Sequence, residues 1–165
     1  MIEPASLISG FREGLSVAGQ FLHGEVEHSH WPAPHNPIAK PKDAAAVYVF
    51  ALSKQAGKNC NAGSGRILKV GKAGQNSNAR YQSQHYGFSA PSTVSKAIFF
   101  NPVLWPYLGI LELEKEMVGD WLRKNTERYN FFLTGRDIAL TSFLETYLKA
   151  VLSPVLEGVQ SKDPK

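Results

Sequence analysis

Residues 46–52, AVYVFAL, and residues 66–72, RILKVGK, are two short runs rich in β-branched and aromatic side chains. Such side chains favour β-strands because they pack well on a pleated surface. Residues 53–65, between the runs, are rich in Gly, Asn, Ser and Lys, a composition typical of a turn or a flexible loop. The two runs therefore predict a β-hairpin with a long loop, and the rest of the chain can be placed around it.

A short polar helix is predicted directly after the hairpin. Ser77 or Asn76 can cap its first turn, and the helix would carry Arg80 and, about a turn later, Gln84 and His85. Five side chains are then expected to converge on one end of a small sheet: Tyr48, Lys69, Lys72, Arg80 and His85. A polar, cationic cluster on rigid elements is the arrangement expected where a phosphate is held.

The chain before the hairpin divides into two segments. Residues 5–22 carry apolar side chains at mixed spacings of three and four, which predicts an amphipathic helix. Residues 23–41 contain four prolines, which forbid a continuous helix, so we expect an extended arm or linker. The arm also holds His23, His28, His30 and His35. A zinc site is one interpretation, but without cysteines or regular spacing a polar arm lying over the core is preferred.

The chain after the hairpin predicts three more helices and a third strand. The helices are expected at residues 92–100, 112–125 and 137–152, and the strand at 128–133. Trp105 and Tyr107, in the apolar run 103–113, are interpreted as core or partner contacts, because base-stacking platforms usually lie among basic residues.

The helix at 137–152 carries a carboxylate among apolar side chains. Its inward face is predicted to hold Ile138, Leu144, Leu148 and Val151. Glu145 stands in the middle of the helix between apolar neighbours. A carboxylate at such a place either lies at the margin of the helix or is held by a partner.

Length and composition favour a single globular unit. A chain of 165 residues suits one domain, or a core of roughly 100 to 120 residues with an appendage. The net charge of +4 and the isoelectric point near 9.2 are compatible with a polyanionic partner. One cysteine, Cys60, excludes an intramolecular disulfide framework. No apolar run approaches the roughly 20 residues of a membrane span and no secretory signal is present, so we expect a cytoplasmic protein without membrane contact.

Four motifs, taken in order, resemble those of the GIY-YIG nucleases. Ala46-Val47-Tyr48 matches the first motif, and Lys69-Val70-Gly71, followed by Lys72, matches the second. Arg80 stands in the following helix, and Glu145, on a helix closed by Pro154, matches the last family element. The resemblance covers residues 44–158.

The match departs from the family pattern at three places. Ala46 replaces the glycine of the first motif, and Lys69 replaces the tyrosine of the second, as lysine does in restriction-enzyme-like and phage-type branches of the family. A histidine or tyrosine often lies one turn after the arginine. Gln84 has that offset here and His85 is one place later, which leaves the role of His85 open.

The resemblance implies an α/β fold with a small three-stranded antiparallel sheet flanked by helices. The expected organisation is an N-terminal helix with an extended arm at residues 1–43, a nuclease domain at 44–158 and a polar tail at 159–165. The implied activity is that of a metal-dependent endonuclease, a hydrolase of DNA phosphodiester bonds.

Each site residue has a role that suits phosphodiester hydrolysis. Glu145 is a hard oxygen ligand for Mg²⁺ or Mn²⁺. Arg80 is suited to a forked contact with the scissile phosphate, and Lys72 supplies a point charge beside it. Tyr48 is expected to be the general base, with a pKa lowered by Lys69, Lys72 and the metal. The resemblance implies the same roles. It leaves open whether the substrate is double-stranded, single-stranded or branched DNA, or RNA.

Two other interpretations remain. One is a catalytically silent module of the same fold that binds nucleic acid or another protein. The other is an unrelated small α/β interaction domain, which would lose support if the hairpin and the Glu145 helix met. Substrate discrimination is expected in the arm, 23–41, or in the loop, 53–65, which would lie beside the site. The helix at 5–22 could instead bury its apolar stripe in a homodimer.

Overall fold

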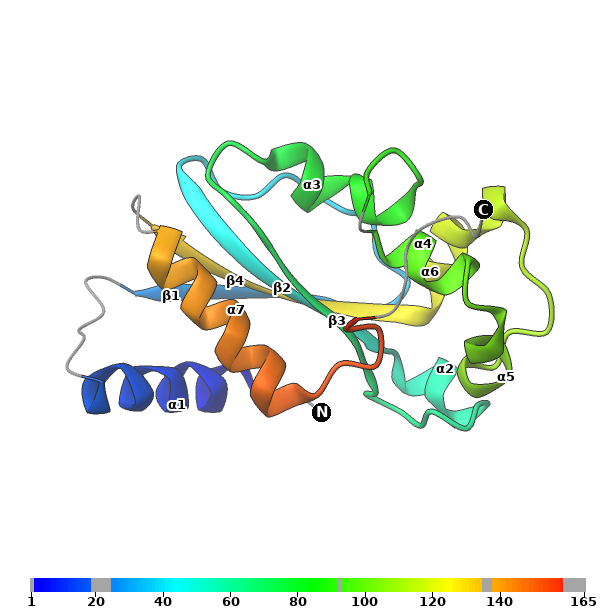
Figure 1. Cartoon of the computed structure of the whole chain (residues 1–165), viewed down its shortest axis with the longest axis horizontal. Coiled ribbons are helices and arrows are strands. Elements are labelled where there is room, and N and C mark those ends of the chain that lie inside the picture. The colour runs from blue at the N-terminus through cyan, green and yellow to red at the C-terminus, as the bar shows by residue number, and fades with distance from the viewer. Residues whose placement is uncertain (1, 19–24, 92, 135–137, 159–165) are drawn as a thin grey trace.

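A four-stranded sheet forms the centre of the protein in the computed structural model, which describes residues 2–18, 25–91, 93–134 and 138–158 (Figure 1). The strands are β1 (Val26–Trp31), β2 (Ala44–Leu52), β3 (Ile67–Ala73) and β4 (Thr126–Thr134). Their order across the sheet is β1-β4-β2-β3, and every neighbouring pair is antiparallel.

The predicted hairpin is confirmed as β2 and β3. The two strands pair antiparallel, with Tyr48 opposite Gly71. Every residue of β2 is buried, because this strand pairs with a neighbour on each side and is covered on both faces. The third predicted strand is also present, as β4.

The prediction of three strands is wrong, because the arm contributes a fourth. Residues Val26–Trp31 form β1, which pairs with β4 in register from Val26↔Leu133 to Trp31↔Arg128. The prolines of the arm begin only at Pro32, so they do not prevent this pairing. The arm is therefore extended, and six of its residues belong to the sheet.

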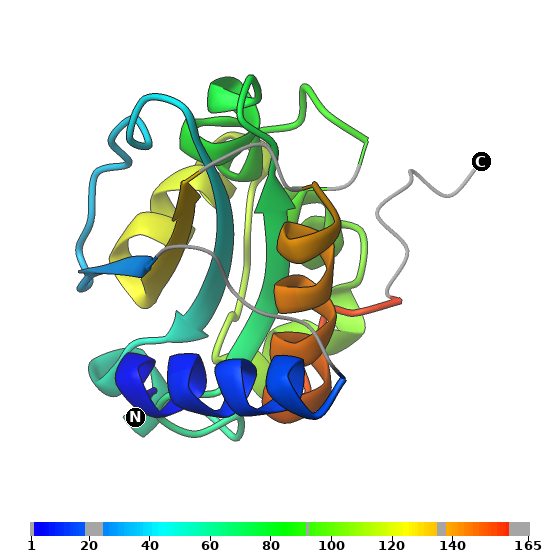
Figure 2. The same cartoon turned by 90° about the vertical axis from the view of Figure 1, so that its left-hand side faces the viewer.

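Helices cover both faces of the sheet (Figures 1 and 2). On one face, α1 (Pro4–Val17) and α7 (Ile138–Leu152) enclose a core with side chains of β2 such as Val47 and Val49. The other face holds α3 (Asn78–Gln82), α4 (Val94–Phe99), α5 (Trp105–Leu108) and α6 (Val118–Asn125) over Tyr48 and Phe50. Trp105 and Tyr107 pack against this second core, as predicted.

The hairpin loop differs from its prediction in both structure and position. It contains a short helix, α2 (Lys54–Lys58), whose first turn is capped by the Ser53 hydroxyl, which accepts from the Ala56 N–H at 3.2 Å. The Ala62 N–H donates to the Tyr107 carbonyl at 2.9 Å. The loop therefore packs against the α5 region, at the end of the hairpin away from Lys72, and does not lie beside the predicted site.

The two helices on the first face bury less than their patterns predicted. In α7, Leu144 and Leu148 are buried, but Ile138 and Val151 are 80% and 53% exposed, so their predicted inward orientation is wrong. Ile138 is the first residue of the helix and Val151 the last but one, whereas Leu144 and Leu148 lie in the part of α7 that packs on the sheet. In α1, the buried Phe11 ring lies 5.7 Å from the ring of Tyr147 on α7. The stripe of α1 is thus covered in part within the chain, at Phe11 and Leu15, whereas Val17 is 86% exposed and residues 19–22 of the predicted helix lie outside the described residues. The homodimer stays a prediction.

The rest of the arm lies over the second core. The buried His35 donates from Nδ1 to the Thr126 carbonyl at 2.9 Å and accepts at Nε2 from the Tyr86 hydroxyl at 2.7 Å. Burial lowers the pKa of His35 to about 4. His30 instead bonds to Glu127 at 2.9 Å. No group of three or more potential metal ligands gathers within the described residues, and His23 lies outside them.

Candidate active site

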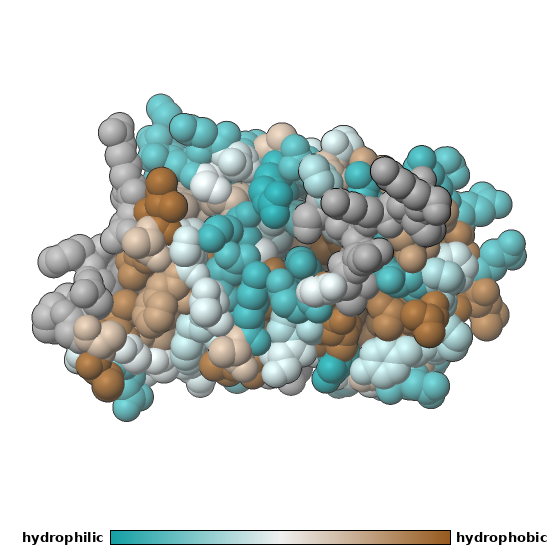
Figure 3. All heavy atoms as spheres, in the orientation of Figure 1, coloured by the Kyte–Doolittle hydropathy of each residue, from teal (hydrophilic) through white to brown (hydrophobic). Residues whose placement is uncertain are grey.

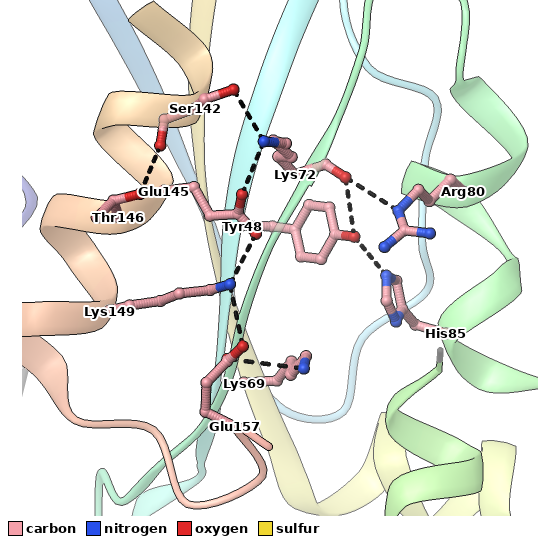
Figure 4. A network of polar contacts seen from close by, with 10 residues as sticks. All are labelled: Tyr48, Lys69, Lys72, Arg80, His85, Ser142, Glu145, Thr146, Lys149 and Glu157. Atoms are coloured by element: carbon pink, nitrogen blue, oxygen red, sulfur yellow. Dashed lines mark hydrogen bonds and ion pairs between the residues drawn. The ribbon is translucent and has the colours of Figure 1, made fainter. Parts of the chain in front are cut away.

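Side chains from both faces of the sheet meet at its edge strand, β3. Because β3 has a neighbour on one side only, groups from both faces can reach around its open edge. From one face comes α7, and from the other come α3 and the 3₁₀ turn η1 (Gln84–Tyr86) (Figure 4). The predicted site residues lie on these elements and on β2 and β3.

Tyr48 occupies the centre of the site and is fully buried. Its ring crosses the neighbouring strand directly over Gly71, where a Cβ atom would lie only 2.7 Å from Tyr48 Cε2. Glycine is therefore the residue that lets the tyrosine ring lie flat over β3. The Tyr48 hydroxyl donates to the Lys72 carbonyl at 3.4 Å and is also bonded to Nε2 of His85.

His85 joins Tyr48 in a defined tautomer. Its Nδ1 accepts from the Val94 N–H at 3.4 Å, so the proton of the neutral ring is on Nε2, which donates to the Tyr48 oxygen. Burial lowers the pKa of His85 well below its usual value, and the charges of Arg128, Arg80 and Lys69 lower it further. The imidazole ring is therefore neutral. Of the two candidates after Arg80, Gln84 and His85, it is His85 that contacts Tyr48.

The expected depression of the Tyr48 pKa is not found. Burial raises the pKa of Tyr48, and the charges of Arg80 and Arg128 oppose this without reversing it. The Lys72 ammonium is turned toward α7 instead. The cations that act on the phenol are thus two arginines and not the two lysines.

Arg80 lies beside the phenol on α3. Its Nε donates to the Lys72 carbonyl at 3.0 Å, so this carbonyl anchors both Arg80 and Tyr48. Ser77, one of the two predicted caps, stands at the N-cap position but makes no side-chain capping hydrogen bond. The helix ends at Gln82, so Gln84 and His85 lie in η1 and not in the predicted helix.

Glu145 meets β3 through a chain of alternating charges (Figure 4). Its Oε2 lies 3.1 Å from Lys72 Nζ, and its Oε1 lies 3.1 Å from Lys149 Nζ. Lys149 continues to Glu157 at 3.0 Å, and Glu157 reaches Lys69 at 3.6 Å. Burial alone would lower the pKa of Lys149, but its bonds to Glu157 and Glu145 raise it overall. The hairpin and the Glu145 helix therefore meet directly.

A cavity of about 830 Å³ opens beside these residues. Lys72, Arg80 and Glu145 line it together with Asp43, Gln75 and Asn76. The middle of this face is hydrophilic and lies between apolar areas (Figure 3). Two cations, Lys72 and Arg80, and two carboxylates, Asp43 and Glu145, thus face a space large enough for a nucleotide-sized group.

Polar contacts connect five of the six predicted residues closely: Tyr48, Lys72, Arg80, His85 and Glu145. Lys69 joins this network through its ion pair with Glu157.

Three residues in or below the site were not predicted. The spacing of Glu145 and Lys149, four apart on a helix, is a sequence signal for their ion pair. Glu157 follows the helix-closing proline and carries no comparable signal. Arg128 alternates with Thr126 and Asn130 along β4, a polar pattern that would place it at the surface, whereas it is fully buried.

The residues fit a divalent metal in part. Mg²⁺ is commonly held by one or two carboxylates with water and substrate phosphate completing its shell, and Glu145 can be such a ligand. Both oxygens of Glu145 are, however, engaged by lysines. A metal ion would have to share or displace these contacts, so we expect weak binding without DNA.

Comparison with protein-family models, curated proteins and solved structures finds no match for this chain. Within the described residues, every helix is too short or too polar to cross a bilayer.

Proposed function

We propose that the protein is a metal-dependent endonuclease of the GIY-YIG type that hydrolyses DNA phosphodiester bonds. The observation that carries the proposal is the continuous polar network that joins Tyr48, His85, Lys72, Arg80 and Glu145 beside one cavity. The contact between the hairpin and α7 also weakens the case for an unrelated interaction domain.

Each side chain of the network has a distinct role in the proposed hydrolysis. Arg80 and Lys72 place two positive charges at the cavity, where they offset the negative charge that grows on the nonbridging phosphate oxygens. Tyr48, once ionised, accepts a proton from the attacking water, and the Nε2–H of His85 stabilises the phenolate by donating to it. Mg²⁺ or Mn²⁺ bound to Glu145 would add Lewis-acid stabilisation of charge on the phosphate.

A catalytically silent DNA-binding module is the second candidate, and specific observations favour it. Tyr48 has no exposed surface, and both oxygens of Glu145 are already paired with lysines. Such a site can attract phosphate through its cations without performing chemistry.

Cleavage assays with plasmid, single-stranded and branched DNA, in Mg²⁺, Mn²⁺ or chelator, separate the two candidates. Glu145→Gln should lower the cleavage rate by on the order of a hundredfold or more, the loss typical of a main electrostatic contributor. DNA affinity should not fall, because the substitution removes a negative charge beside Lys72 and Lys149. Glu13→Gln, at an exposed position of α1, is the matched control.

The outcomes are distinct. Wild-type protein that binds all three DNAs and cuts none would identify the silent module. Cleavage retained by Glu145→Gln would contradict the proposed mechanism.

A further inference from the structure

Arg128 is a charged residue in the interior of the protein. It lies on β4, which pairs with β2 so that Arg128 stands opposite Phe50. Its side chain is fully buried, and among the described residues its three guanidinium nitrogens make no hydrogen bond of normal geometry. Burial raises the pKa of Tyr86, whereas the charge of Arg128 and hydrogen bonding between its guanidinium and the Tyr86 hydroxyl act to lower it.

Aromatic rings surround the guanidinium. The distances from Arg128 Cζ to the ring centroids are 4.3 Å for Tyr81, 4.6 Å for Tyr48, 4.7 Å for Trp31 and 5.1 Å for Phe50. Ring faces attract a cation, and arginine keeps its proton under all ordinary conditions. The site therefore contains a permanent positive charge beneath Tyr48.

Stability alone does not explain this charge. A buried cation without a carboxylate or a full set of hydrogen bonds is costly, and an apolar side chain of similar volume is often as stable or more stable. The contacts with the ring faces offset some of that cost. A role for the charge itself is therefore indicated.

The charge acts on the two groups at the centre of the site. Tyr48 is faced by Arg80 from α3, by Arg128 from β4, by His85 from η1 and by Glu145 from α7. Of these charged groups, the two arginines favour the phenolate and Glu145 disfavours it.

His85 is faced by the same cations. Burial is the largest cause of its lowered pKa, followed by the charges of Arg128, Arg80 and Lys69. Arg80 and Lys69 are partly exposed and can be drawn to a bound phosphate. Arg128 cannot move in this way, because it is enclosed by rings.

We propose that Arg128 is a positioning residue of the site: its fixed charge, in addition to burial, keeps His85 neutral, so that Nδ1 can accept from the Val94 N–H, and it supports the negative charge that Tyr48, whose ring lies 4.6 Å from Arg128 Cζ, gains on losing its proton. The effect on His85 is independent of any reaction, whereas the effect on cleavage rests on the proposed nuclease function.

The first test needs no substrate. Arg128→Met removes the charge while keeping an unbranched apolar side chain that packs well against rings. Arg123→Met is the matched control, because Arg123 lies 5.1 Å from the Tyr86 ring but pairs with Asp120 at the surface. His85 is followed by NMR through the imidazole signals as the pH is lowered. Its protonation should begin at a higher pH in Arg128→Met than in wild type and Arg123→Met. Identical titrations would overturn the proposal.

Thermal unfolding of the same variants separates the charge from a structural role. Arg128→Met should melt no lower than wild type, since it replaces an unpaired buried charge. Arg128→Lys keeps a cation without the planar fork and serves as a second variant. Unfolding of both variants under conditions where wild type is folded would assign Arg128 to structure and overturn the proposal.

The second test uses cleavage and a double-mutant cycle. Arg128→Met should reduce the single-turnover rate by about tenfold or more at constant DNA affinity, as expected for lost electrostatic support of a transition state. In a Tyr48→Phe background the same change should have little further effect, because the group through which Arg128 acts is gone. Additive losses would contradict the proposal. If wild type does not cut DNA but the His85 shift is seen, the nuclease function fails and the effect of Arg128 on His85 stands.

Discussion

Acidification should destabilise the protein through His35, a buried residue at the junction of the arm and the second core. The neutral ring donates to the Thr126 carbonyl and accepts from Tyr86, so a second ring proton would face the hydrogen of the Tyr86 hydroxyl. Burial is the main cause of the lowered pKa of His35; its bond to Thr126 opposes this, and the charges of Arg128 and Arg123 add to it.

The size of the effect follows from the two pKa values. His35 has a pKa of about 4 in the folded protein against 6.5 in the unfolded chain. Between these values the unfolded chain binds more protons, so the free energy of unfolding falls as the pH falls from about 6.5 toward 4. At about 1.4 kcal/mol per pH unit, His35 contributes a loss of about 3 kcal/mol by pH 4. The lowered pKa of His85 acts in the same direction.

Urea unfolding at a series of pH values from about 7.5 down to about 4 measures how the free energy of unfolding depends on pH. His35→Gln should be less stable than wild type at neutral pH and should lose less stability on acidification. His28→Gln, at an exposed position of β1, is the control and should follow wild type. The reasoning would be refuted if the free energy of unfolding of wild type did not change over this pH range. It would also be refuted if His35→Gln lost stability with the same slope as wild type.

Three further substitutions test the site and the core. Gly71→Ala should cost about 1–3 kcal/mol by thermal or urea unfolding and should slow DNA cleavage, because its Cβ would meet the Tyr48 ring at 2.7 Å; unchanged unfolding and cleavage would show that the ring position is not constrained. Arg80→Ala should reduce cleavage by on the order of a hundredfold in the plasmid assay, and a rate equal to wild type would remove Arg80 from the proposed mechanism. Phe11→Ala should cost about 3–5 kcal/mol in urea unfolding because the ring is buried against α7, whereas a loss below about 1 kcal/mol would mean that α1 is not firmly docked.

Deleting residues 1–41 is not a clean test of the arm. The deletion would remove β1 and Trp31, whose ring lies 4.7 Å from Arg128 Cζ. Loss of function in such a protein would not distinguish an arm that reads DNA from an arm that completes the sheet.

The amino-acid sequence by itself determined the β2–β3 hairpin, β4, α7 and the order of the candidate site residues, but not β1 or α2. The β2–β3 hairpin follows from dense β-branched and aromatic runs, and α7 follows from an apolar pattern closed by a proline. These signals are reliable because they depend on side chains a few positions apart. Glu145 was singled out by its place in the ordered motifs that resemble those of the GIY-YIG nucleases, because the helix pattern alone also fits a carboxylate at a solvated margin.

Only the tertiary structure decided which distant segments meet. The β1 strand is short and polar, and its pairing is supplied by β4, about a hundred residues later, as the pair Ser29↔Asn130 shows. The partners of Glu145 lie on two different elements, and the contact of His85 with Tyr48 depends on how η1 packs against β2. The polar residues around Arg128 in the sequence predict a surface position. In the structure Arg128 is buried, because four aromatic rings from three other segments enclose its guanidinium. Burial and pKa are properties of such long-range packing, so the sequence identified the polar groups and the fold decided their charge states and partners.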